Sequence, residues 1–176
     1  MISRRQFGVA LGACLAAFVP AASADAYVAT GTPWPNNEVT YTTKTTAYAA
    51  SVDRAAAILN RTGIRVRFRR VASNPDVTFT YHGPACDGSS YIGYQPRVKH
   101  NNVWLGAGCS RDLITLTAVH EMGHVLGLDH EDRRCARMNS GYHPNGTPNH
   151  CGQRSMSYWL KHPLMADDVR GLRALY

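Results

Sequence analysis

The 176-residue sequence lacks a hydrophobic run long enough to span a bilayer. The apolar stretch at residues 8–19 falls well short of the roughly 20 residues that a transmembrane helix needs. Acidic residues are also few, 12 Asp and Glu against 19 Lys and Arg, and no internal repeat is present. With 44% hydrophobic and 18% charged residues, the composition excludes a wholly disordered chain, a collagen-like repeat and a coiled coil. We therefore expect a mildly basic globular protein.

Residues 1–24 have the pattern of an export signal. Arg4-Arg5-Gln6-Phe7 precedes the apolar stretch, and the small residues 22–24 suit a signal peptidase. The paired arginines resemble a twin-arginine signal, while ordinary Sec export and a lipid anchor at Cys14 stay open. We expect a secreted protein, extracellular or periplasmic and not stably inserted in a membrane, whose residues 25–176 form a single domain.

All of the five cysteines except Cys14 lie in the expected mature chain. An even number of cysteines in an exported chain predicts two disulfides, and three pairings are possible. We favour the pairing of sequence neighbours, Cys86 with Cys109 and Cys135 with Cys151. A cysteine zinc cluster is disfavoured, because no two cysteines have the close spacing that such clusters use.

The spacing of apolar residues predicts a mixed α/β fold, α+β in class, with a twisted sheet beside two helices. Strands are expected at 39–41, 64–69 and 77–81, with further short strands at 91–94 and 103–105. Helices are expected at about 47–62, 112–127 and 166–176. Gly63 would end the first of them, and Ser110 or Asp112 would cap the start of the second.

The second predicted helix carries His120-Glu121-Met122-Gly123-His124, and the motif continues through Gly127 to His130 as H-E-x-x-H-x-x-G-x-x-H. Histidines at i and i+4 lie on one helix face, so His120 and His124 can bind one metal ion. A left-handed turn at Gly127 would end the helix and bring His130 to the same ion. Three neutral imidazoles leave a tetrahedral zinc one open position, which distinguishes catalytic from structural zinc.

Glu121 is the candidate catalytic residue. Its side chain is rotated from the two histidines by about 100° and can reach a zinc-bound water without displacing a ligand. We expect Glu121 to take a proton from that water and pass it to the leaving amine, while zinc polarises the peptide carbonyl. The motif therefore predicts a zinc-dependent endopeptidase, a hydrolase of protein or peptide substrates, with one catalytic zinc.

The motif resembles that of the metzincin clan of zinc endopeptidases, and further details are most similar to the matrixins. Met138 and Tyr142 follow His130 at the matrixin spacing, and residues 167–176 resemble the closing matrixin helix. The resemblance implies a turn at Met138 beneath the zinc and a pocket, bordered by Tyr142, for the substrate residue after the cleaved bond. It implies that the paired aspartates Asp167 and Asp168 brace this turn and the mature N-terminus.

The same resemblance implies a fold and a type of enzyme. The fold has a sheet of about five strands, two long helices above the active-site cleft and a third helix below it. The enzyme would be a secreted bacterial peptidase. In contrast to matrixins, we expect no prodomain, because only the expected signal precedes Asp25. We also expect a monomer with no nucleic-acid partner.

Several residues depart from the matrixin pattern. Ser140 stands where matrixins usually have proline, and Glu131 is the residue that astacins carry after the third histidine, although astacins have a longer gap to their methionine. The Cys135–Cys151 loop resembles snapalysin, whose third metal ligand is an aspartate, and Asp129 would be that candidate here.

A second metal site stays open. The structural zinc and the calcium ions of the family lie in the stretch equivalent to residues 82–110. Three residues offer ligands there, namely His82, Asp87 and His100, but their spacing does not reproduce the family pattern. We favour the alternative that they are surface residues of a disulfide-tied loop.

Two other functions also stay open. Arg65, Arg67, Arg69 and Arg70 could bind a polyanion, and the three tryptophans, Trp34, Trp104 and Trp159, could stack on sugars. The chain would then be a secreted basic binding protein with a non-catalytic zinc site. The other alternative is a zinc hydrolase of cell-wall peptides. For a peptidase, Tyr91–Tyr94 is our candidate for the edge strand that binds the substrate.

Overall fold

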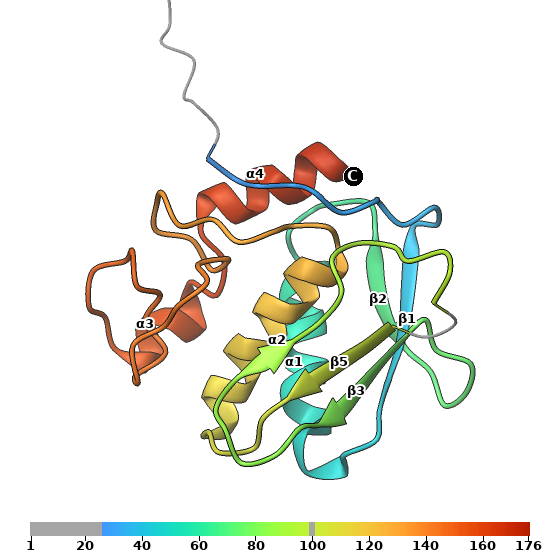
Figure 1. Cartoon of the computed structure of the whole chain (residues 1–176), viewed down its shortest axis with the longest axis horizontal. Coiled ribbons are helices and arrows are strands. Elements are labelled where there is room, and N and C mark those ends of the chain that lie inside the picture. The colour runs from blue at the N-terminus through green and yellow to red at the C-terminus, as the bar shows by residue number, and fades with distance from the viewer. Residues whose placement is uncertain (1–25, 99–100) are drawn as a thin grey trace, which may run out of the picture.

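A five-stranded sheet forms the centre of the computed structural model, which describes residues 26–98 and 101–176 (Figure 1). The strands are β1 (Glu38–Thr43), β2 (Arg67–Arg70), β3 (Val77–Tyr81), β4 (Gly88–Ser89) and β5 (Asn101–Leu105). Their order across the sheet is β2-β1-β3-β5-β4. The first four strands in this order are parallel, and β4 pairs antiparallel with β5 at one edge. The expected export signal, residues 1–24 with Cys14, lies outside the described residues.

Two long helices, α1 (Ala49–Asn60) and α2 (Arg111–Val125), run side by side next to the sheet (Figure 1). A short 3₁₀ helix, η1 (Thr46–Tyr48), precedes α1. Gly63 lies three residues after the end of α1 and has a φ of 81°, a left-handed conformation that glycine adopts without strain. The predicted cap of α2 is present, because the Ser110 side chain accepts a hydrogen bond from the backbone N–H of Leu113.

The main core lies between the sheet and these two helices. On β1, Val39 and Tyr41 are buried and alternate with partly exposed residues, so this strand packs one face against the core. Phe79 on the central strand β3 and Val119 on α2 are no more than 1% exposed. Since full burial of such a side chain stabilises the fold by about 1.5–3 kcal/mol, this layer holds α2 firmly in place.

The C-terminal part of the chain forms a second, smaller layer. It contains α3 (Met156–Lys161), where Trp159 is 1% exposed, and α4 (Ala166–Leu175). The N-terminal segment passes along α4 (Figure 1), where a Cβ added to Gly171 would lie 2.9 Å from the Cβ of Tyr27. This packing places both ends of the described chain beside the end of α2.

The predicted mixed α/β class with a five-stranded sheet is confirmed. The predicted strand at 64–69 begins at Arg67, although Ile64 and Val66 are buried ahead of it. The short helix α3 was not predicted. The expected strand at Tyr91–Tyr94 is wrong, because the edge strand is β4, which ends at Ser89. The backbone of the expected strand pairs elsewhere, since Gly93 donates to the carbonyl of His124 and Tyr94 to that of Thr32.

Within the described ranges, every helix is too short or too polar to cross a bilayer.

Candidate active site

Helix α2 ends in a tight left-handed turn. The backbone N–H of Gly127 donates to the carbonyl of His124, and that of Leu128 donates to the carbonyl of Gly123. These two bonds, with a φ of 106° at Gly127, define a Schellman motif. The motif reverses the chain directly after the helix, and therefore directs the following segment back along the histidine-bearing face.

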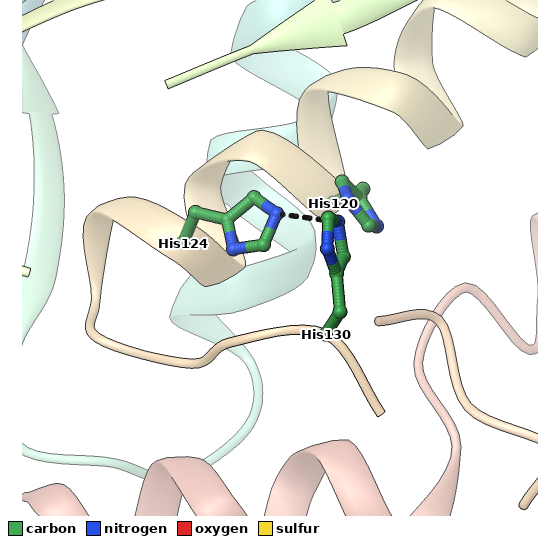
Figure 2. A group of neighbouring side chains, drawn as sticks. All are labelled: His120, His124 and His130. Carbon is green, nitrogen blue, oxygen red and sulfur yellow. Dashed lines mark hydrogen bonds between the residues drawn. The ribbon is translucent and has the colours of Figure 1, made fainter. Parts of the chain in front are cut away.

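Three histidines meet at this turn. Their ligand nitrogens all lie within 4.8 Å of one another, and the Nε2 atoms of His124 and His130 are 3.2 Å apart (Figure 2). Two of them, His120 and His124, come from consecutive turns of α2, whereas His130 approaches from the loop after Gly127. The spacing therefore gathers three imidazoles around one point, as a tetrahedral metal site requires.

The outer nitrogens of the helical histidines face carbonyl groups. Nδ1 of His120 lies 2.9 Å from the carbonyl oxygen of Arg137, and Nδ1 of His124 lies 2.8 Å from that of Leu128. A carbonyl can only accept, so each Nδ1 carries the proton and each Nε2 keeps its lone pair for a metal. Burial, assisted by the neighbouring His124, lowers the pKa of His120 to about 3, and burial also lowers the pKa of His124. Both imidazoles are therefore neutral, which is the form that binds a metal.

Asp129, the alternative third ligand, is engaged elsewhere. Its two carboxylate oxygens accept hydrogen bonds from the backbone N–H of His130, at 2.7 Å, and from the hydroxyl of Thr30, at 2.9 Å. The metal-binding group found among the described residues contains His120, His124 and His130 without Asp129. Asp129 thus orients the loop that carries His130.

Glu121 is 3% exposed and faces the segment that follows β4. Its Oε2 accepts a hydrogen bond of 2.8 Å from the hydroxyl of Ser90. Burial raises the pKa of Glu121 to about 7, an effect that the Ser90 hydrogen bond opposes and the charge of Asp87 reinforces. A carboxyl group with a pKa near neutrality can both accept and release a proton, as general acid–base chemistry requires.

Met138 lies beneath the helical part of the site. It is 2% exposed, and a Cβ added to Gly123 would lie 2.5 Å from its sulfur atom. The turn that holds Met138 is fixed by Asp168 of α4, whose carboxylate accepts hydrogen bonds from the backbone N–H groups of Arg137, Met138 and Met165. One buried carboxylate therefore ties this turn to α4.

A cleft of about 790 Å³ contains the three histidines and Glu121. Tyr142 lines it and is 38% exposed, and its hydroxyl lies 2.8 Å from Nδ1 of His120 and donates to the carbonyl of Arg137. The structure contains two disulfides, Cys86–Cys109 and Cys135–Cys151. The first joins two residues of the cleft wall, and the second closes the loop that carries Met138 and Tyr142.

The residues considered for other roles make contacts of their own in the described part of the chain. Each of the four arginines donates a hydrogen bond to another residue: Arg65 to Tyr176, Arg67 to Asn60, Arg69 to Glu38 and Arg70 to Asp53. Trp159 is buried, and the indole of Trp34 donates to the carbonyl of Val125. His82 and Asp87 form no metal-binding group with described neighbours, and His100 lies outside the described residues.

Comparison with protein families gives a match over most of the chain. The profile of the astacin family of peptidases covers residues 27–140, which includes the three histidines and Glu121. The chain belongs to the astacin family. Astacins are metzincins, so the predicted clan is confirmed, and the family identifies the chain as a zinc metallopeptidase that acts on protein or peptide substrates.

The astacin match differs from the expectation in one respect. The matrixins, which the spacing of Met138 and Tyr142 resembles, are not the family that the profile identifies. The match stops at residue 140, so Tyr142 and α4 lie beyond the astacin segment. Comparison with curated proteins gives no significant match.

Two side chains of this astacin site were missed by sequence reasoning. Ser90 lies in a Gly- and Ser-rich stretch, where its contact with Glu121, 31 residues away, leaves no periodic signal. Arg137 immediately precedes Met138 and is 1% exposed, whereas arginine is almost always at the surface. Only the packing of the turn reveals it.

Proposed function

We propose that the protein is a secreted zinc endopeptidase in which Glu121 is the general base. One observation carries this proposal: three histidine nitrogens that lie close together and the buried carboxylate of Glu121 line the same cleft. The astacin family supports the zinc peptidase activity. The family and the geometry together support cleavage within a protein chain, because the cleft is open to solvent at Tyr142 and His130.

His120, His124 and His130 would hold the single catalytic zinc. The donor set fits this ion, since three imidazoles gather around one point and His120 and His124 keep proton-free Nε2 atoms, which matches the preference of zinc for nitrogen ligands. When bound, zinc supplies Lewis-acid polarisation of the peptide carbonyl and makes water a better nucleophile. No second zinc or calcium forms part of this proposal.

Glu121 performs the proton transfers. Its carboxylate accepts a proton from the attacking water and then delivers it to the nitrogen of the leaving amine. The hydrogen bond from Ser90 fixes Oε2, so the carboxylate does not have to reorganise during the reaction. The pKa of about 7 brings the acid and base forms close in free energy at neutral pH.

Two residues beyond the helix complete the site. Tyr142 borders the pocket that receives the substrate side chain after the scissile bond, a role supported by its place in the cleft wall and its contact with His120. Met138 supports the histidines from below, because its sulfur packs against Gly123 between the two helical ligands. Substitution of either residue would therefore change the shape of the site and leave the proton-transferring group, Glu121, in place.

Export through residues 1–24 is part of the proposal, with the mature protein acting outside the cytoplasm as a monomer without a nucleic-acid partner. The two disulfides support this location, because disulfides persist mainly in oxidising compartments. N-terminal sequencing of the protein recovered from the growth medium or periplasm tests it. A start at residue 25 is expected, and an intact N-terminus in the cytoplasm would contradict export.

The activity is tested with purified zinc-loaded protein and unfolded casein. Cleavage should stop when a chelator removes zinc, return when zinc is added, and be absent in Glu121→Gln at unchanged zinc content. Glu38→Gln is the matched control, because Glu38 is an exposed carboxylate paired with Arg69 and should leave cleavage intact. Stoichiometric zinc without cleavage of casein or any peptide would overturn the proposal.

A further inference from the structure

Four exposed arginines surround the turn at residues 61–63, which follows α1. Arg61 lies in the turn itself, Arg65 follows it, and Arg67 is the first residue of β2. Arg173 comes from α4, whose C-terminal end lies beside this turn (Figure 1). We call these four residues the arginine patch.

Hydrogen bonds to backbone carbonyls bring the patch together. Nη1 of Arg67 donates to the carbonyl of Asn60 at 2.7 Å, and Nη2 of Arg173 donates to that of Thr62 at 3.2 Å. These two carbonyls belong to the residues on either side of Arg61. Each bond uses one of the five N–H donors of a guanidinium, so both groups are held in place and keep donors for a ligand.

Arg65 approaches the same group of charges from the C-terminal side. Its Nε donates to the backbone oxygen of Tyr176 at 3.2 Å, and Tyr176 lies three residues after Arg173. The patch therefore combines residues that are more than 100 positions apart in the chain, and the packing of α4 against the turn after α1 creates it.

The patch carries a charge that the fold does not neutralise. Arg69 and Arg70, at the end of β2, form ion pairs with Glu38 and Asp53. Within the described residues, no carboxylate side chain pairs with an arginine of the patch. The C-terminal end of α1 contributes about half a negative charge, which a single cation would offset. A surface with this excess of positive charge attracts a multivalent anion.

The patch lies away from the active-site cleft. The strands β2 and β4 form opposite edges of the sheet, and β4 is the strand that borders the cleft. At about 4.8 Å between neighbouring strands, the width of the sheet between these edges is roughly 19 Å. None of the four arginines lines the cleft. A polymer bound at the patch therefore leaves the cleft open to a peptide.

The surface suits a polysaccharide better than a nucleic acid. Single-stranded nucleic acids stack their bases on aromatic rings, but the exposed aromatic residues of the described chain, Tyr81, Tyr91 and Tyr142, lie outside the patch. Tyr176 is partly buried, and backbone groups engage its hydroxyl on both sides. The two disulfides also fit an oxidising, extracellular location, where acidic polysaccharides are common polyanions.

We propose that the arginine patch binds an acidic polysaccharide and holds the protein at a surface coated with that polymer while the cleft stays free. Each guanidinium presents a planar pair of N–H donors that matches two oxygens of a sulfate or carboxylate group. The carbonyl contacts already fix three of the four guanidinium groups, which reduces the entropy lost on binding. The inference does not depend on peptidase activity.

Binding is measured with the zinc-loaded wild-type protein and dextran sulfate whose sulfation matches the charge spacing of DNA. Dextran of the same length is the neutral control, and duplex DNA represents the other class of polyanion. We expect dextran sulfate to bind, with an affinity that falls roughly 10-fold or more between about 0.05 and 0.3 M salt. Failure of dextran sulfate to bind, equal binding of neutral dextran, or tighter binding of DNA would overturn the inference.

Two sets of substitutions assign the binding to the patch. The patch variant combines Arg61→Gln, Arg65→Gln, Arg67→Gln and Arg173→Gln. The control variant removes the same charge at exposed positions elsewhere and combines Arg97→Gln, Arg111→Gln, Arg134→Gln and Lys161→Gln. We expect the patch variant to bind dextran sulfate roughly 100-fold more weakly, and the control variant to lose no more than about 3-fold. Equal losses in the two variants would show that binding follows net charge alone and would refute the patch.

Thermal unfolding and zinc content show whether the patch variant folds. If it does not, Arg61→Gln alone decides, because the side chain of Arg61 has no hydrogen-bond or ion-pair partner among the described residues. This substitution should weaken binding by about 3-fold, and Arg61→Lys, which keeps the charge, should restore it. Wild-type affinity in Arg61→Gln would then contradict the inference.

Peptide cleavage in the same samples separates this inference from the proposed function. Dextran sulfate should leave kcat/KM for a short peptide unchanged, because the patch and the cleft lie apart. Inhibition that is equally strong in the patch variant would place the polymer in the cleft and remove the inference. Binding at the patch without cleavage of casein or any peptide would support the inference and overturn the proposed function.

Discussion

The hydroxyl of Ser90 donates a hydrogen bond of 2.8 Å to Oε2 of Glu121, which joins the segment after the edge strand to the middle of α2. The same edge approaches the carboxylate from a second side, since a Cβ added to Gly88 would lie 2.6 Å from Oε1. The orientation of the proposed general base is therefore set by β4 and the residue that follows it, rather than by α2 alone.

Ser90→Ala should lower kcat by about 10-fold, because a hydrogen bond to a charged group is worth about 1.5–3 kcal/mol and holds the carboxylate in its reactive orientation. KM and zinc content should stay unchanged, and Ser90→Thr, which keeps the hydroxyl, should restore most of the rate. Steady-state kinetics on one peptide gives kcat and KM for the wild type and for both variants. Ser73→Ala, at an exposed position, is the control. A Ser90→Ala protein with wild-type kcat would show that the hydrogen bond has no catalytic role.

Gly88→Ala should lower kcat by roughly 10- to 100-fold with little loss of stability. The new methyl group would meet the carboxylate of Glu121 and, at 2.8 Å, the methyl of Thr117, so the edge strand or the side chain must shift. Gly152→Ala offers a matched control, since an added Cβ there meets nothing within 4 Å. Kinetics and thermal unfolding of both variants provide the comparison. Equal activity of the two variants would contradict the close contact at Gly88.

Asp168→Ala should reduce the free energy of unfolding by about 3 kcal/mol, because it leaves three buried N–H groups without their acceptor. For a chain of this size the melting temperature should fall by roughly 10 °C. Asp112→Ala is the control, because Asp112 is half-exposed and its ion pair with Arg54 is worth about 1 kcal/mol at most. Chemical denaturation measures both variants. A change in Asp168→Ala no larger than that in Asp112→Ala would be inconsistent with the bracing role.

Replacing both Cys135 and Cys151 by serine should destabilise the protein by about 3 kcal/mol, as expected for a disulfide between residues 16 apart in the sequence. Activity should fall as well, since the freed loop carries Met138 and Tyr142. Calorimetry with and without a reductant tests the prediction. Reductant should lower the melting temperature of the double variant less than that of the wild type, because the variant keeps only Cys86–Cys109. An unchanged melting temperature in the double variant would show that this disulfide does not stabilise the fold.

Local patterns predicted the elements whose geometry is local. The i, i+4 spacing placed His120 and His124 on one face of α2, and the glycine after the helix does adopt the left-handed conformation expected of it. The prediction of a strand at 91–94 was wrong because the pairing of a strand is not determined locally. Its pairing depends on which distant backbone groups it meets, and its amides bond to the end of α2 and to the N-terminal segment instead.

The sequence by itself determined the three-histidine motif, the carboxylate proposed as the general base and the class of fold, because these depend on helical periodicity, on strand alternation and on residue chemistry at fixed spacing. The tertiary structure decided the environment of the motif. It placed Ser90 against Glu121 and Asp168 under the turn at Met138, and it buried Arg137 beside Tyr142. Such contacts join segments far apart in the chain, so they arise from packing, and no local pattern of residues encodes them.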